Sequence, residues 1–276
     1  MSVPPLVVCV AAAALYALGG RGSVGGARTR RRLQALYYYG AVAILFVVLE
    51  PPLDNLADRS FAFHMVQHVF LLTVVPPLVI LGRPWPRVWL PFPAGLRRRV
   101  VRGVARGSWS GPIRAVSRGI ARPVVAWAFL AAAIGAWHVP YLYDAAVRNE
   151  GVHFGEHACF LVAALVYWGV LLDAPPVRAR VDHLRRATWF ALGAVPGWIL
   201  AIVLAFAGTP LYGAYVSADR PFGMSAYTDQ QLSAGVMWVP GSLAFFVAFF
   251  ISVYRWLEPD AREAQAEPRH EELSWT

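Results

Sequence analysis

The chain has 276 residues, of which 58% are hydrophobic and only 15% are charged. Soluble domains are usually closer to one quarter charged, so this composition excludes an ordinary soluble domain and predicts an integral membrane protein. All 25 basic residues are arginines, and the formal net charge is +9. In a membrane protein such arginines indicate orientation, so we expect no nucleic-acid partner.

Seven apolar segments are long enough, or nearly so, to cross a hydrocarbon core of about 30 Å. In chain order they are Val3–Gly19, Leu33–Leu49, Phe61–Leu81, Val124–Val139, His153–Leu172, Thr188–Ala207 and Leu232–Trp256. Arginines follow the first segment rather than precede it, which predicts a retained span instead of a signal peptide. We therefore expect an all-α, polytopic bundle of seven transmembrane helices. This single domain covers residues 1–257, and a polar cytoplasmic tail covers 258–276.

The arginines concentrate in alternate connections between these segments. The connection over residues 83–122 alone contains ten arginines and no acid, whereas the alternate connections hold only Arg59, Arg148 and Arg220. Because arginines flanking spans are retained on the cytoplasmic side, the N-terminus is predicted outside and the C-terminus in the cytoplasm. All seven segments agree with this orientation.

The basic loop 83–122 contains LRRRVVRGVARG, in which Leu96, Val100 and Val104 recur at four-residue spacing. This spacing places the three apolar side chains on one helix face, with arginines around them. Such a pattern predicts a short helix that lies on the inner membrane surface, where the lipid bilayer and its anionic headgroups are the expected partner.

Five of the seven histidines fall at the predicted outer ends of three spans. They are His64, His68, His138, His153 and His157. Two pairs among them have i, i+4 spacing, so each pair projects from one helix face. Polar side chains within a membrane turn toward the bundle interior, because exposure to lipid is costly. The neutral imidazole is a common ligand of zinc and copper. We therefore expect the five histidines to form one metal site.

Further ligands are available near the same depth. Glu156 shares the face of His153 and is expected to accept the other ring N–H of a ligand histidine. Asp229 offers a carboxylate and Met237 a thioether at the outer end of the last span, whereas Met65 lies about 100° around the helix from His64. Imidazole with thioether suits copper and imidazole with carboxylate suits zinc, so the ligand types leave the metal open.

The segment HFGEH at 153–157 also matches H-x-x-E-H, the inverted zinc-protease motif. A membrane-embedded zinc hydrolase with Glu156 as the general base is therefore an alternative function. A copper transporter is a third hypothesis, which the apolar residues below the histidines disfavour. Cys9 and Cys159 form no CxxC pair, which argues against a thiol-based copper carrier.

Four stretches together resemble a known family, the CtaG-type cytochrome c oxidase assembly factors, which are seven-span bacterial integral membrane proteins. The stretches are FHMVQHVFLLTVVPPLVILGRPW at 63–85, AWHVPYLYDAAV at 136–147, VHFGEHACFLVAALVYWGVLL at 152–172 and TDQQLSAGVMWVPGSLA at 228–244. The resemblance implies a non-enzymatic protein of the bacterial plasma membrane. It also implies that the protein supplies copper to the oxidase subunit that carries a copper centre.

The resemblance favours copper over zinc as the bound metal. Carried over by position, it implies roles for the five histidines and for Met65, Glu156, Asp229 and Met237, and it adds Asp144 as a possible additional or supporting residue. We therefore expect copper at a histidine cluster near the outer surface of the membrane.

Overall fold

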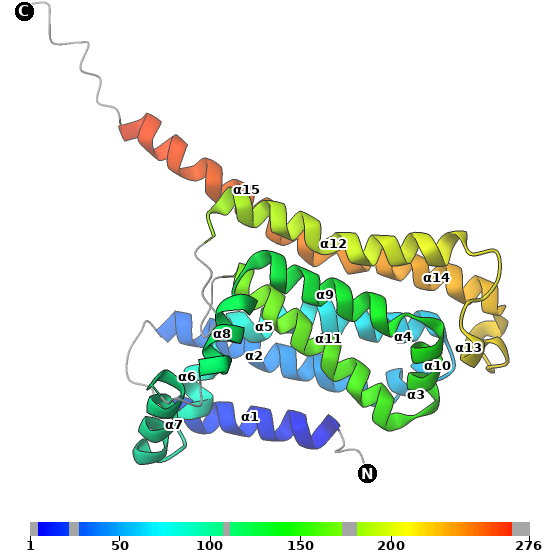
Figure 1. Cartoon of the computed structure of the whole chain (residues 1–276), viewed down its shortest axis with the longest axis horizontal. Helices are drawn as coiled ribbons and strands as arrows, with labels where there is room; N and C mark the ends of the chain where they lie inside the picture. The colour runs from blue at the N-terminus through cyan, green and yellow to red at the C-terminus, as the bar shows by residue number, and fades with distance from the viewer. Residues whose placement is uncertain (1–4, 22–27, 107–110, 173–180, 267–276) are drawn as a thin grey trace, which may run out of the picture.

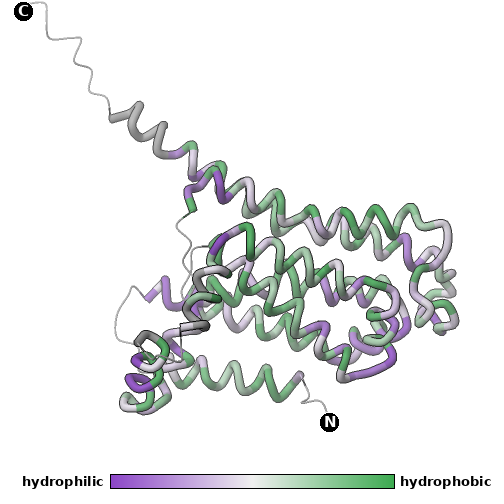
Figure 2. Tube along the Cα trace, in the orientation of Figure 1, coloured by the Kyte–Doolittle hydropathy of each residue, from purple (hydrophilic) through white to green (hydrophobic). Residues whose placement is uncertain are grey.

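The structure is a computed structural model that describes residues 5–21, 28–106, 111–172 and 181–266. Every regular element in these ranges is a helix, which confirms the predicted all-α class. The long helices run side by side as one bundle (Figure 1). Hydrophobic residues lie along the helices, and hydrophilic residues gather toward the two ends (Figure 2).

The long helices of the bundle follow the predicted apolar segments, and shorter helices connect them. The long elements are α1 (Pro5–Arg21), α2 (Arg28–Leu49), the continuous run of α4 (Phe61–Val69), η1 (Phe70–Val74) and α5 (Val75–Leu81), then α9 (Pro123–Trp137), α11 (Glu150–Leu171), α12 (His183–Phe206), α14 (Ala226–Trp238) and α15 (Pro240–Ala266). The short elements are α3 (Leu53–Ala57), α6 (Pro84–Trp89), α7 (Ala94–Arg106), α8 (Gly111–Ile120), α10 (Pro140–Arg148), α13 (Gly213–Val216) and η3 (Pro221–Gly223).

Five helical segments among the described residues are long and apolar enough to cross a membrane. They are Arg28–Leu49, Phe61–Leu81, Glu150–Leu171, His183–Phe206 and Ala226–Glu258. A sixth results if α9 and α10, which meet at a bend of 73°, count as one broken span. The helix over Pro5–Gly20 is apolar but shorter. The chain is thus a multi-helix membrane protein, while seven spans and the orientation of the termini stay predictions.

Two prolines inside long helices leave carbonyl groups without their usual amide donor, and tryptophans supply the missing hydrogen bonds. Pro76 cannot donate to the Leu72 carbonyl, which instead accepts a bond of 3.0 Å from Trp168 Nε1. Likewise, Pro196 in α12 leaves the Leu192 carbonyl free, and Trp127 Nε1 donates to it at 2.8 Å. These bonds satisfy backbone groups that water cannot reach, so the helices continue past their prolines.

Helix α11 lies at the centre of the packing. It contacts α9, α5 and η1, and its buried face contributes Phe160, Ala163, Ala164, Tyr167 and Trp168 to the main hydrophobic cluster. By contrast, α12 and α15 expose large apolar side chains such as Ile199, Val203 and Phe250. An outward face of this kind suits contact with lipid.

Two features that the sequence predicts for the cytoplasmic side can be compared with the structure. Residues 96–106 of the segment LRRRVVRGVARG lie in α7, with Leu96 and Val104 exposed, and residue 107 lies outside the described residues. Contact of this helix with lipid stays a prediction. Helix α15 continues to Ala266, beyond residue 257 where the membrane domain was expected to end. The remainder of the predicted tail, residues 267–276, lies outside the described residues.

Candidate metal centre

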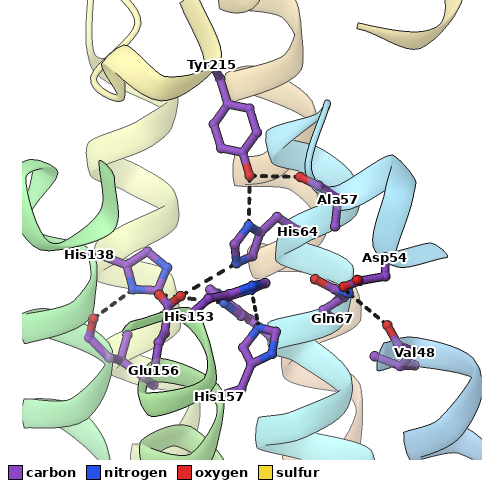
Figure 3. A network of polar contacts seen from close by, with 12 residues as sticks. Val48, Asp54, Ala57, His64, Gln67, His138, His153, Glu156, His157 and Tyr215 are labelled. Carbon is purple, nitrogen blue, oxygen red and sulfur yellow. Dashed lines mark hydrogen bonds and ion pairs between the residues drawn. The ribbon is translucent and has the colours of Figure 1, made fainter. Parts of the chain in front are cut away.

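The histidines occupy three neighbouring elements at one end of the bundle. His64 and His68 lie one turn apart on α4, and His153 and His157 lie one turn apart on α11. His138 follows the last residue of α9, at the bend before Pro140. The i, i+4 spacing keeps each pair on one face, and the packing turns those faces toward each other (Figure 3).

The five imidazole rings form one continuous cluster. The centroids of the His64 and His68 rings are 4.4 Å apart, and those of His153 and His157 are 4.1 Å apart. The two pairs meet through His64 and His153, at 4.9 Å between centroids, and through His68 and His157, at 5.3 Å. His138 joins at 5.5 Å from His68. The structure therefore brings together all five histidines selected from the sequence.

Four residues supply the tightest group of ligand atoms. One atom each from His64, His68, Glu156 and His157 lies within 4.8 Å of every other, and all four residues are buried. Ligands bound to one ion at about 2.0 Å lie roughly 3.3 Å apart in tetrahedral geometry. The group is therefore only slightly wider than a coordination sphere.

Glu156 lies between the two histidines of α4. Its Oε2 is 3.7 Å from His64 Nε2, and its Oε1 is 3.7 Å from His68 Nε2, which is beyond hydrogen-bond distance. Its side chain is completely buried, and neither carboxylate oxygen has a hydrogen-bond partner among the described residues. Burial of an unsatisfied carboxylate is costly, so this position needs an additional cation or proton.

Tyr215 on α13 fixes the orientation of the His64 ring. Burial raises the pKa of its hydroxyl well above the ordinary value, so the group remains protonated. Its single hydrogen is donated to the Ala57 carbonyl at 2.9 Å, so His64 Nδ1–H donates to the same hydroxyl at 2.7 Å. His64 Nε2 therefore carries the lone pair, directed toward Glu156 (Figure 3).

His138 has the same tautomer for a different reason. Its Nδ1 lies 2.8 Å from the Ile134 carbonyl, which can only accept, so Nδ1 carries the hydrogen. Its Nε2 is buried and has no hydrogen-bond partner within the described part of the chain. The two histidines thus keep one nitrogen each available as a metal ligand.

The carboxylates of Asp229 and Asp144 act as helix caps. Asp229 accepts hydrogen bonds at the start of α4, from the Ser60 hydroxyl at 2.7 Å and from the Phe61 and Ala62 amides at 2.8 and 3.0 Å. Asp144 Oδ1 accepts a bond of 3.0 Å from the Ala214 amide in the first turn of α13. Asp229 therefore fixes the start of α4, which carries His64, and Asp144 fixes the start of α13, which carries Tyr215. Both aspartates position the ligand-bearing elements through hydrogen bonds to hydroxyl and amide groups at these helix starts.

The two methionines lie in the hydrophobic packing beside the site. Met65 and Met237 belong to one hydrophobic cluster with Phe61 and Leu204. The methyl group of Met237 also packs against Gly197 of α12. Their surroundings account for both side chains as apolar packing.

Sequence reasoning missed two residues that support the site. Tyr215 lies in the connection between the last two predicted spans, 151 positions from the histidine it contacts, and no motif in the sequence links the two residues. Gln67 lies between the histidines of α4, and its Nε2 donates to the Val48 carbonyl at 2.8 Å and to Asp54 Oδ1 at 3.0 Å. Its position in the HMVQH segment was the one available signal, because i, i+3 spacing places it near the face of His64.

The sequence matches a family described as cytochrome c oxidase caa3 assembly factor (Caa3_CtaG), over residues 13–259. The chain belongs to this family. The match covers every element that contributes to the histidine cluster, and it bears out the resemblance drawn from the four sequence stretches. The family description names assembly of cytochrome c oxidase, and the long apolar helices of the chain agree with a membrane protein.

Three mycobacterial proteins are similar to the chain over most of its length. The chain is 25% identical over 214 residues to the uncharacterised proteins Mb0105 of Mycobacterium bovis and MT0111 of Mycobacterium tuberculosis, covering 77% of this chain and 32% of each relative. It is 21% identical over 248 residues to the uncharacterised protein ML1998 of Mycobacterium leprae, covering 86% of the chain and 36% of the relative. The chain therefore spans about one third of the length of these relatives. No solved structure matches it.

Proposed function

We propose that the protein is an assembly factor that binds copper at the cluster of His64, His68, Glu156 and His157 and assists its delivery to a cytochrome c oxidase subunit. The observation that carries this proposal is the group of four buried ligand atoms within 4.8 Å of one another. Family membership supplies the oxidase as the object of assembly.

The available donor atoms support a bound metal ion. His64 Nε2, both ring nitrogens of His68 and both oxygens of Glu156 are buried without hydrogen-bond partners among the described residues. Such atoms are rare in folded proteins, because each costs about 1–3 kcal/mol if it stays unsatisfied. A single cation at their centre would bind His64 Nε2, one ring nitrogen of His68 and the Glu156 carboxylate. His138 and His153 are further ligands at the edges of the same cluster.

Nitrogen and carboxylate donors bind Cu²⁺ and Zn²⁺ alike, and we propose copper as the cargo because the proposed client is a cytochrome c oxidase subunit that carries a copper centre. Delivery to another protein requires a site that also releases its ion. The separations of 3.7 Å between Glu156 and the α4 histidines are close to the spacing of about 3.3 Å between ligands of one ion, so small movements of these side chains would bring them to binding distance.

Membrane-embedded zinc hydrolysis is the alternative that the motif at 153–157 suggests. One observation favours it, because His64 and His68 supply the further metal ligands that HFGEH lacks. A general base must however reach a water or substrate beside the metal. Glu156 is completely buried between two imidazoles, which suits a ligand better than a base. We therefore place the assembly role first.

A transporter would need polar groups that continue through the bundle. Beyond the histidines, the buried face of α11 contributes Phe160, Ala163 and Ala164, which are apolar. This part of the described interior gives an ion no ligands, so the transporter hypothesis ranks last.

The copper content of the oxidase tests the proposal in cells. Cells that lack the protein would be complemented with wild type, with His64→Ala or with His157→Ala, and copper would be measured in the purified oxidase. His183→Ala is the matched control, because His183 begins α12 at the other end of the bundle. We expect loss of oxidase copper with the two cluster variants and not with the control. Normal oxidase copper in both cluster variants would contradict the proposal.

A further inference from the structure

A cavity of about 450 Å³ lies beside the histidine cluster, between α1, α2 and α3 on one side and α11 on the other. His153 and His157 form part of its wall, together with apolar residues such as Val8, Leu45 and Leu161. His157 also belongs to the four-residue ligand group. The cavity therefore reaches the candidate metal centre itself.

Four carboxylates line the same cavity, and no lysine or arginine is among the described residues that line it. The four acids are Glu50, Asp54, Asp58 and Glu150. Asp58 and Glu150 are exposed, whereas Glu50 and Asp54 are partly buried. Their shared place in the lining brings these acids together. Burial raises the pKa of Asp58, the carboxylates of Asp54 and Glu150 raise it further, and His153 opposes this shift. An acidic cavity with low-dielectric walls concentrates cations.

His153 connects the acids to the cluster. It lies close enough to Asp54 and Asp58 to interact with both carboxylates. Its Nε2 is 3.1 Å from His157 Nε2, close to the separation of two ligands on one ion (Figure 3). Burial increases along this path, from exposed Asp58 through partly buried His153 to the enclosed ligand group.

We propose that the acidic cavity is the route by which the metal ion enters and leaves the cluster, and that His153 is the transfer ligand between the two. This inference rests on the proposed metal-binding function and deepens it. The ligand is a hydrated divalent cation such as Cu²⁺. Oxygen groups at the rim replace part of its hydration shell, and imidazoles then replace the oxygens. The unpartnered atoms of His64, His68 and Glu156 lie at the end of this route.

The rate of metal uptake tests this route separately from the site. Cu²⁺ would be mixed with the purified full chain, and quenching of tryptophan fluorescence would follow the association rate at low and high ionic strength. The variant combines Asp58→Asn with Glu150→Gln, which removes two rim charges and keeps the ligand group. Asp219→Asn is the control, since this exposed acid pairs with Arg59 near α3 but does not line the cavity.

We expect the double variant to associate roughly tenfold more slowly at low ionic strength, with the same final stoichiometry as wild type. The difference should shrink at high salt, because screening removes electrostatic attraction. An unchanged rate, or equal slowing in Asp219→Asn, would overturn the route. With either result, metal binding by wild type would leave the proposed metal-binding function intact and refute only the route. A wild type that takes up no metal would overturn both.

A steric pair of variants tests the passage itself. Ala158→Phe fills the cavity from α11, whereas Val162→Phe enlarges an exposed position of the same helix outside the cavity. We expect slower metal uptake with Ala158→Phe and an unchanged rate with Val162→Phe. The apolar wall could instead hold a lipid acyl chain. Displacement of co-purifying phospholipid by Ala158→Phe, with metal uptake unchanged, would identify that occupant and refute the cation route.

Discussion

The Tyr215 hydroxyl links the His64 ring to the backbone of α3: it accepts the Nδ1 hydrogen at 2.7 Å and donates its own to the Ala57 carbonyl at 2.9 Å. A residue of the short helix α13 thereby selects the tautomer of a histidine on α4. Supporting hydrogen bonds of this kind orient metal-binding histidines and raise their basicity.

Tyr215→Phe is predicted to weaken metal binding while the bundle stays folded. The substitution keeps the buried ring and removes the group that orients His64, so we expect a 10- to 100-fold loss of affinity, measured by competition with a chelator. Tyr212→Phe is the matched control. The Tyr212 hydroxyl donates to the backbone carbonyl of His138 and not to a ring nitrogen. Equal affinities for wild type and Tyr215→Phe would show that the bond has no role at the site.

The Glu156→Gln variant distinguishes a role of Glu156 as a metal ligand from a role as a general base. Glutamine is neutral and nearly isosteric, so the metal-free protein should melt no lower than wild type, because a buried unsatisfied carboxylate has been removed. Metal affinity should fall by at least about tenfold, because the negatively charged ligand is lost. The measurements are thermal unfolding with and without metal, and elemental analysis. Full metal retention in the variant, together with loss of a hydrolytic activity, would favour the zinc hydrolase instead.

Asp229→Asn is predicted to destabilise the protein even without metal. Asp229 uses both oxygens to cap α4, and asparagine keeps only one acceptor, so we expect a loss of roughly 1–2 kcal/mol in the free energy of unfolding. Denaturant unfolding of the metal-free protein checks this value. If Asp229 were a metal ligand rather than a cap, the metal-free stability would not change and only the stabilisation by metal would be lost.

Much of the helical fold follows from the sequence, because apolar runs that cross a membrane must form helices. The short elements around the site could not be predicted in the same way. Helices α3, α10 and α13 have between four and nine residues, and isolated helices of that length are unstable in water. Helix α13 depends on a cap from Asp144, which is distant in sequence.

The convergence of the histidines was partly predictable. The i, i+4 spacing of His64 with His68, and of His153 with His157, fixes one shared face within each helix. The rotation of α4 and α11 about their own axes, which brings the two histidine-bearing faces together, depends on the packing of α11 against neighbouring helices. No local sequence pattern encodes this packing. The roles of Tyr215 and of the acidic cavity depend on contacts over long sequence distances for the same reason.

Gly19→Ala is predicted to loosen α1 from α6. A β-carbon at Gly19 would overlap the Arg87 carbonyl oxygen, so the backbone must move, and we expect a loss of about 1–3 kcal/mol in the free energy of unfolding. Gly20→Ala is the control, because the nearest atom there is the end of the flexible Arg87 side chain at 4.0 Å. Thermal unfolding of both variants in the same membrane mimetic gives the comparison. A smaller loss in Gly19→Ala than in Gly20→Ala would contradict the observed packing of α1.

Elemental analysis of the purified protein tests the central claim most directly. Wild type would be compared with a variant in which His64, His68, His153 and His157 are all alanine, after equal exposure to copper and removal of unbound ion. We predict about one tightly held ion per wild-type chain and none in the variant, with both proteins retaining helical circular dichroism. Equal metal content in the two proteins would contradict the account, because the ion would then be bound elsewhere.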